Sequence, residues 1–162
     1  MSGGAHLSLL RTRGTAAAVL LLTLVGCGVG ETKVVDVSAP ALDGSRARLC
    51  TALEGALPSE VADMWQRDVT TGGVAAAWGA PPIVLRCGVT DAEGLGPAVR
   101  CDVMNGVGWY SEDIGDGYRF TTIGRATPVE LTVPDEYAPE ADAAVDVAAA
   151  IKQAIPQHHP CV

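Results

Sequence analysis

The residue types that most often carry catalysis are few in this chain, and their spacing is unfavourable for it. After residue 26 the only histidines are the neighbours His158 and His159, close to the carboxyl terminus. A serine nucleophile would need one of these tail imidazoles as its base, and a metal ion would need further ligands beside them. The acidic residues of 112–116 lack the alternating carboxylates and the final glutamate of a calcium loop. We therefore expect a non-catalytic protein with no metal site and no cofactor.

Cys27 is the residue with the clearest predicted chemistry. It follows Leu24-Val25-Gly26, which ends an apolar run that begins at Ala16 and is preceded by Arg11 and Arg13. This layout is typical of a secretory signal, and the run is about half of the roughly 20 residues that span a bilayer. The last four residues resemble the bacterial lipobox, which implies attachment of diacylglycerol to Cys27, cleavage before it and acylation of the new amino terminus. The alternative is an ordinary cysteine that follows a plain signal peptide.

The lipobox resemblance divides the chain and predicts where it works. Residues 1–26 become a lipoprotein signal peptide, and the mature chain is predicted to be extracytoplasmic and held at the cell membrane by its lipid. Two or more acyl chains are needed for stable anchoring, because a single chain binds only marginally. Residues 27–44 are rich in Gly, Val, Ser, Pro and Asp without a sustained period, which predicts a flexible tether. Residues 45–162 are long enough for one domain.

Four cysteines remain once Cys27 is lipidated. An even number of cysteines in an exported domain predicts two disulfides, and each would contribute roughly 3–4 kcal/mol by the loop-entropy estimate. Three pairings are open, and cysteine spacing does not choose among them. A reduced metal site is disfavoured because no CxxC spacing occurs. The four residues are Cys50, Cys87, Cys101 and Cys161.

The charge of the mature chain narrows the class of partner. All 19 acidic residues but only nine of the 11 basic ones follow residue 26, which leaves a net charge of −10. Nucleic acid is therefore a poor candidate, since its phosphates require Lys and Arg. Anionic lipid headgroups would also repel such a chain, so the predicted acyl groups must hold it to the membrane. We expect the partners to be the membrane, through the anchor, and an envelope protein or the cell wall.

Two helices are predicted, one near each end of the domain. Asp43 or Ser45 can cap the first, and Pro58 stops it. Its apolar residues recur at steps of four at Leu49, Leu53 and Leu57. Pro139 suits the first turn of the second, which Pro156 ends. Its predicted buried stripe consists of Val145, Ala148, Ile151 and Ile155.

Between the helices the pattern is that of strands. Residues 83–87 form a β-branched run bounded by turn residues, which predicts the central strand, and residues 129–133 alternate with period two. Asn105-Gly106 between apolar residues is a strong hairpin signal. Further strands are predicted at 65–70, 74–78 and 118–123, with a short edge strand near 34–37. The predicted fold is α+β: an antiparallel meander of about five strands with two helices on one face, a two-layer sandwich.

Three residues are candidates for ligand binding. Arg86 lies inside the most apolar strand, where a guanidinium must meet a carboxylate or face a site for an anion. Trp78 and Trp109 are either core aromatics or platforms for a ligand. Cys50 on the first helix and Cys87 at the end of the central strand could form a bridge between helix and sheet. The cysteine pattern alone still leaves the three pairings open.

Residues 78–89, with the sequence WGAPPIVLRCGV, resemble the signature of an uncharacterised actinobacterial family of exported, membrane-attached proteins. Residues 105–110, 120–125 and 133–139 are similar to its later motifs in the same order, so the resemblance covers about residues 46–156. It implies cysteines at positions 50 and 87, hence a Cys50–Cys87 disulfide and, by remainder, Cys101–Cys161. Ala80 departs from the pattern, since many relatives carry an acidic residue there. The resemblance implies no activity.

The sequence therefore predicts a lipid-anchored extracytoplasmic protein that acts as a binding or cell-envelope accessory module. A small enzyme or sensor is the first alternative, acting on an envelope-derived ligand through a pocket lined by Trp78, Arg86 and Trp109. A purely structural subunit of a membrane complex is the second, and it would expose an apolar patch.

Overall fold

A computed structural model of the chain describes Met1 and residues 33–90 and 100–161. The helices and strands described here all belong to one compact unit, which extends to the carboxyl-terminal residues. The predicted signal peptide and Cys27 lie outside the described residues.

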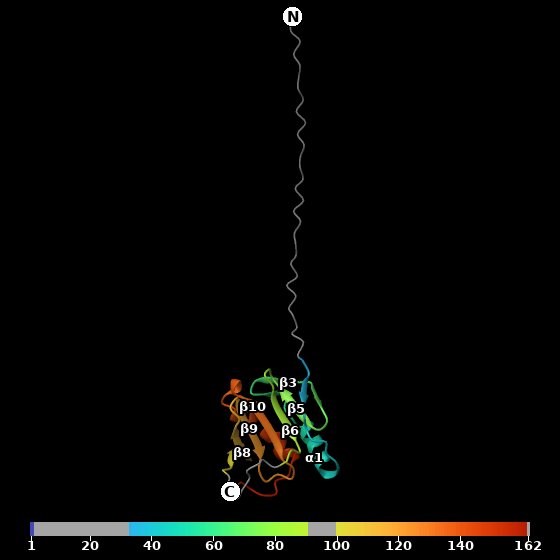
Figure 1. Ribbon diagram of the computed structural model, residues 1–162, viewed down its shortest axis with the longest axis vertical. Helices are drawn as coiled ribbons and strands as arrows, with labels where there is room; N and C mark the ends of the chain where they lie inside the picture. Colours follow the sequence, from blue (N-terminus) through green and yellow to red (C-terminus); the bar gives the residue numbers. More distant parts are fainter. Residues whose placement is uncertain (2–32, 91–99, 162) are drawn as a thin grey trace. The chain divides into compact units, whose positions relative to one another are not determined.

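The folded unit begins with a short strand, continues mainly through strands and ends with a helix of 14 residues (Figure 1). In chain order the elements are β1 (Val35–Val37), α1 (Gly44–Glu54), β2 (Glu60–Val61), β3 (Met64–Arg67), β4 (Val69–Thr71), β5 (Ala75–Trp78), β6 (Ile83–Cys87), β7 (Asp102–Met104), β8 (Val107–Asp113), β9 (Gly117–Thr122), β10 (Val129–Pro134), the 3-10 helix η1 (Asp135–Tyr137) and α2 (Ala141–Ala154).

Eight strands form one antiparallel sheet in the order β2-β3-β5-β6-β10-β9-β8-β7. Strands β7 to β10 are a meander, and β10 returns to pair with β6. Strand β6 thus lies inside the sheet, as its apolar run predicts. A parallel pair, β1 with β4, lies apart from this sheet. The α+β class is confirmed, whereas the estimate of five strands is too low because strands of two to four residues are too short for a period to show.

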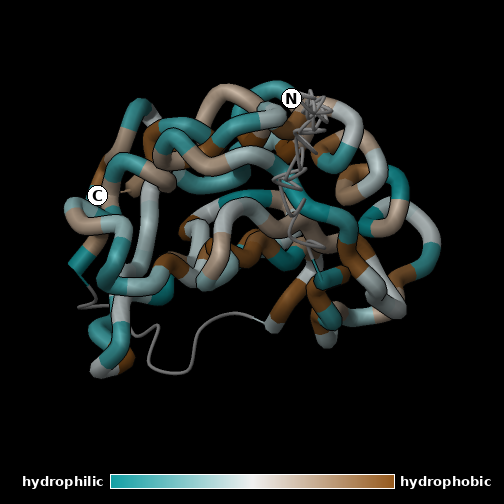
Figure 2. The backbone as a smooth tube through the Cα atoms, turned by 90° about the horizontal axis from the view of Figure 1, so that it is seen from above, coloured by the Kyte–Doolittle hydropathy of each residue, from teal (hydrophilic) through white to brown (hydrophobic). Residues whose placement is uncertain are grey.

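The core lies between one face of the sheet and the helices. On β6 the side chains of Ile83, Leu85 and Cys87 are buried against the helices, while Val84 and Arg86 face the other side. Helix α1 contributes Cys50 and Leu53 to this core, and α2 contacts α1. Figure 2 shows hydrophobic segments in the middle of the unit and mostly hydrophilic turns around them. Burial of these side chains is the main stabilising contribution.

Helix α2 buries Ala148 and Ile151 of its predicted stripe, but not Val145. Val145 is 40 % exposed, and the buried positions are mainly alanines together with Val147 and Ile151. Five of the seven buried residues of the helix are alanines, so small side chains form most of its buried face. Ile155 is buried as predicted, but it follows the helix in an extended conformation.

The segment that precedes α1 lies on the opposite face of the sheet. Val37 is buried, and the carbonyl of Ser38 accepts a hydrogen bond of 3.0 Å from Arg86 Nη1. Gly73 approaches Pro40 so closely that a Cβ atom at Gly73 would overlap the carbonyl oxygen of Pro40. Residues 37–40 of the segment predicted to be a flexible tether are therefore packed on the folded unit.

Candidate functional site

Two cysteine pairs lie at disulfide distance, and they are the pairs that the family resemblance implies. Cys50 and Cys87 join α1 to the end of β6 with a Cα–Cα distance of 5.7 Å, and both are fully buried. Cys101 and Cys161 have a Cα–Cα distance of 5.9 Å and are half-buried. Disulfides persist in oxidising compartments, so the two pairs indicate an extracytoplasmic environment.

Among the described residues no helix has the length and apolar character that would be needed to cross a membrane.

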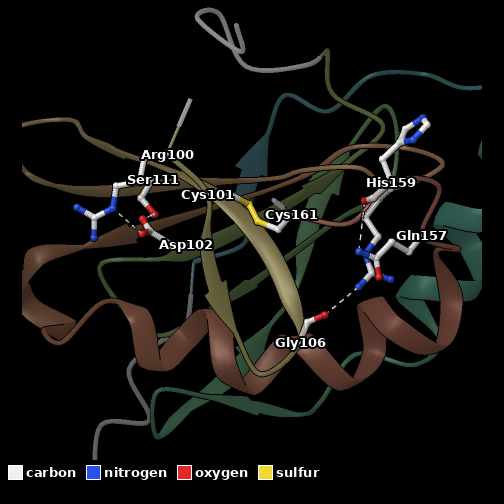
Figure 3. Close-up of a disulfide and its surroundings, with 9 residues drawn as sticks. Arg100, Cys101, Asp102, Gly106, Ser111, Gln157, His159 and Cys161 are labelled. Atoms are coloured by element: carbon white, nitrogen blue, oxygen red, sulfur yellow. Dashed lines mark hydrogen bonds and ion pairs between the residues drawn. A yellow bond between two sulfur atoms is a disulfide. The ribbon is translucent and has the colours of Figure 1, made fainter. Parts of the chain in front are cut away.

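The second disulfide fastens the carboxyl-terminal tail to the sheet (Figure 3). It packs on Gly108, where a Cβ atom would lie 2.6 Å from Cys161 Sγ. The tail is held by its backbone as well, because the amides of His158 and His159 both donate to the carbonyl of Gly124. Both histidines are exposed, which agrees with the prediction of a solvated tail.

Arg125 supports the same tail from the loop between β9 and β10. Its Nη1 atom donates to the carbonyl of Ile155 at 2.9 Å, just after α2. Burial lowers the pKa of this guanidinium below its ordinary value, because a charge is less well solvated there. Arg125 therefore joins the end of α2 to the sheet.

Asp102 lies beside this disulfide and links pH to stability. Ser111 Oγ donates to Asp102 Oδ2 at 2.8 Å and Arg100 Nε donates to Oδ1 at 2.9 Å, and the Ser111 hydrogen bond is the main cause that lowers the pKa of Asp102 below its ordinary value of 3.8. A carboxyl whose folded pKa is lowered stabilises the fold above its unfolded pKa, and this contribution is lost as pH falls through the folded value.

We therefore expect Ser111→Ala to reduce the free energy of unfolding at pH 7 and to have a smaller effect below pH 3.8. Urea unfolding of the wild type and the variant, at pH 7 and at a pH below 3.8, measures the loss of stability under each condition. Arg100→Ala is the control, since Arg100 is largely exposed and its ion pair should contribute less. An equal loss at both pH values would show that Asp102 is not the cause.

Arg86 is held in an ion pair on the face of the sheet away from the helices. Its Nε and Nη2 atoms donate to Glu130 Oε1 at 2.9 and 2.5 Å, and Arg119 Nε lies 3.8 Å from Glu130 Oε2. Glu130 is buried and lies directly opposite Arg86 on the neighbouring strand β10. Of the two alternatives for Arg86, a carboxylate partner or a site for an anion, the structure shows a carboxylate partner, Glu130.

Trp78 and Trp109 are both fully buried on the helix side of the sheet. Trp78 Nε1 donates to the carbonyl of Pro58 at 3.0 Å, and Trp109 packs edge-to-face against Phe120 with ring centroids 6.2 Å apart. Within the described chain, Trp109 Nε1 has no hydrogen-bond acceptor. Because Arg86 faces the other side, the structure does not bring the three predicted ligand residues together.

A groove with a volume of about 550 Å³ lies between the β2–β3 turn, η1 and the start of α2. We call it the acidic groove, because four of its lining residues are carboxylates and none is basic. It is lined by Ala62, Asp63, Met64, Glu136, Tyr137, Ala138, Pro139, Asp142, Val145 and Asp146.

Hydrogen bonds hold two walls of the acidic groove in place. The amide of Ala62 donates to Asp146 Oδ2 at 2.8 Å, which fastens the β2–β3 turn to α2. Tyr137 donates its hydroxyl to the carbonyl of Pro81 at 2.7 Å. Position 79, next to the Tyr137 hydroxyl, requires a glycine. Gly79 has a φ of +71°, and a Cβ atom there would lie 2.6 Å from that hydroxyl.

The acidic groove combines exposed carboxylates with apolar surface. Asp63, Glu136 and Asp142 are exposed carboxylates, while Met64, Tyr137 and Val145 supply apolar surface. The described residues contain no cluster of three or more His, Cys, Asp or Glu side chains arranged for a metal ion.

Sequence reasoning missed the acidic groove, because its walls come from distant parts of the chain. Ala62 and Asp146 are 84 residues apart. The available signal was the concentration of five acidic residues between 135 and 146.

Comparison with known proteins places the chain in a family but adds no activity. No curated protein and no solved structure matches it. The model of the family described as "Protein of unknown function (DUF3515)" matches residues 14–160, which is most of the chain. The chain therefore belongs to the DUF3515 family, whose function is unknown.

Proposed function

We propose that this chain is a lipid-anchored extracytoplasmic binding module whose acidic groove receives a basic segment of a cell-envelope protein. Two features support the anchor: the lipobox-like Leu24-Val25-Gly26-Cys27 and the two disulfides, which indicate an oxidising, extracytoplasmic environment. Intact-mass analysis of the native protein tests it, since diacylglycerol and an amide-linked acyl chain would add their masses to a chain that begins at Cys27. An unmodified Cys27 would contradict the anchor.

The acidic groove is the observation that carries the binding role. Its carboxylates surround apolar surface at Met64, Tyr137 and Val145 without a basic residue in the lining. Lys and Arg side chains can lay their methylene stems on such a surface while their charged ends meet carboxylates. A segment in which basic and apolar residues are interleaved therefore complements both the carboxylates and the apolar surface of the acidic groove.

The geometry favours binding over catalysis. The lining residues contribute carboxylates and one tyrosine hydroxyl, and that hydroxyl already donates to Pro81. The alternative enzyme or sensor needs a pocket shared by Trp78, Arg86 and Trp109. The two indoles are buried on one side of the sheet and the guanidinium is paired with Glu130 on the other.

Neutralising two groove carboxylates should weaken binding of a basic peptide. We expect Asp63→Asn/Asp142→Asn to lower the affinity for a synthetic lysine–leucine peptide by roughly 5- to 30-fold, because two exposed ion pairs of about 0.5–1 kcal/mol each are lost. Asp146 is left unchanged because it holds the β2–β3 turn. Isothermal titration calorimetry at low and at raised salt measures the change, and salt should weaken the wild-type complex.

Glu112→Gln/Asp113→Asn is the matched control, since it removes the same charge from β8, away from the groove. Its affinity should stay close to that of the wild type. An equal loss in both double variants would show that net charge alone attracts the peptide. Tetralysine should bind more weakly than the lysine–leucine peptide, because it has no leucine side chains to contact the apolar surface of the groove.

A further inference from the structure

We infer that Trp65 docks into the surface of the bilayer to which Cys27 is anchored, an inference that rests on the lipid anchor of the proposed function. Trp65 is 69 % exposed, whereas Trp78 and Trp109 are fully buried. It follows Met64 on β3, and successive side chains of a strand face opposite sides. Met64 thus packs toward the core while Trp65 projects away from it.

The chain enters the fold at the same end as Trp65. Arg67 donates from Nη2 to the carbonyl of Lys33 and from Nη1 to the carbonyl of Gly79 at 2.8 Å. The amide of Gly79 in turn donates to the carbonyl of Trp65 at 3.2 Å. One guanidinium therefore holds the first described residues of the folded unit beside the β5–β6 turn and Trp65. In Figure 1 β3 lies at the upper end of this unit and the carboxyl terminus at the lower end.

The length of chain between the anchor and the fold limits which surface can meet the bilayer. Five residues separate Cys27 from Lys33, so the two Cα atoms can be at most about 22 Å apart. A compact domain of about 130 residues has a radius of gyration of about 14 Å, or roughly 35 Å across. The end that carries Lys33 can therefore reach the headgroups, whereas the end that carries the tail disulfide cannot.

The exposed residues at this end suit a bilayer interface. Tryptophan has an amphipathic ring that is enriched at the boundary between lipid and water, and Val34, next to Lys33, is 49 % exposed. Glu60 lies opposite Trp65 on β2, and Arg67 lies two residues beyond it on the same face. The charges are thus mixed, so apolar contact rather than attraction to anionic lipid drives the docking.

The lipid anchor allows a weak contact between Trp65 and the bilayer to persist. Once Cys27 is held in the bilayer, insertion of Trp65 is an intramolecular step with a high effective concentration. Without the anchor a single tryptophan on a chain of net charge −10 should not hold the protein on a membrane. Docking through Trp65 would also bring the acidic groove, whose wall includes the adjacent Met64, close to the membrane surface.

The three tryptophans allow a direct test, because only Trp65 is accessible to a quencher in water. The native lipidated chain is reconstituted on phosphatidylcholine vesicles, and its emission is measured with acrylamide and with brominated acyl chains. We expect the acrylamide-sensitive part of the emission to be lost on the vesicles, and brominated lipid to quench it instead. In Trp65→Phe both changes should be absent, while emission from Trp78 and Trp109 persists.

Three outcomes would overturn the inference. If Cys27 carries lipid but Trp65 stays fully accessible to acrylamide, the inference that Trp65 docks on the bilayer is wrong, whereas the lipid anchor is confirmed. If a chain that starts at Gly28, and so lacks the lipid, shows the same shielding on the same vesicles, the claim that docking of Trp65 depends on the anchor is wrong. If intact mass shows Cys27 unmodified, the anchor fails and the docking fails with it.

Discussion

Replacing Cys50 and Cys87 together by alanine should lower the free energy of unfolding by about 4 kcal/mol. The bridge spans 37 residues of sequence and joins α1 to β6, an inner strand of the sheet. Without it the unfolded chain gains the conformational freedom that the closed loop denies it. Domains of this size are stable by about 5–15 kcal/mol, so a large share of the total is at stake. Urea unfolding followed by circular dichroism measures the loss.

The two disulfides should differ in their response to a reducing agent. Cys50 and Cys87 are fully buried, whereas Cys101 and Cys161 are half-buried at the tail, and attack by a thiolate requires access to a sulfur atom. Mild reductant followed by alkylation and mass analysis should therefore label Cys101 and Cys161 first. If Cys50 and Cys87 were labelled first or at the same rate, the burial of the bridge between α1 and β6 would be wrong.

Trp78→Ala should destabilise the domain by about 3–5 kcal/mol, because it leaves a cavity in the core. Trp78 is fully buried, pairs with Ile83 across the β5–β6 ladder and donates its indole N–H to Pro58. Trp78→Phe keeps much of the aromatic volume and loses the hydrogen bond, so its loss should be smaller. Thermal and urea unfolding of the three proteins measure the series.

Trp65→Ala is the matched control for the core substitution. Trp65 is the same residue type at an exposed position, and substitutions at such positions usually change stability by about 0.5 kcal/mol or less. If Trp78→Ala were as stable as the wild type but lost binding of the lysine–leucine peptide, Trp78 would be a ligand platform. A comparable loss of stability in both tryptophan variants would contradict the burial that separates them.

Local pattern predicted much of the sheet and both helices. The β-branched run at 83–87 is β6, and Asn105-Gly106 forms the turn between β7 and β8. These signals succeed because turn chemistry and alternation act over a few residues. The strand count failed where elements are shortest: residues 65–70 divide into β3 and β4 at Asp68, and β2 has two residues. The buried stripe of α2 was predicted correctly at Ala148 and Ile151 and wrongly at Val145, which is exposed.

The candidate site depended on contacts between distant residues. Arg86 finds its carboxylate 44 residues later at Glu130, and Ala62 finds Asp146 after 84 residues. A sequence pattern names the residue that needs a partner but not which partner the fold supplies. For the same reason Trp78, Arg86 and Trp109 looked like one site, although strand alternation places Arg86 on the far face of the sheet from the two indoles.

The sequence by itself determined the properties that depend on neighbouring residues: the cysteine that ends the apolar run, the acidic charge, the turns and the α+β class. The tertiary structure alone decided which carboxylates form the acidic groove, which tryptophan is exposed and which face of the sheet carries Arg86. The physical reason is the separation along the chain over which each interaction acts. Dihedral preferences and side-chain periodicity act over a few residues, whereas a groove or a buried ion pair exists only after strands from distant parts of the chain have paired.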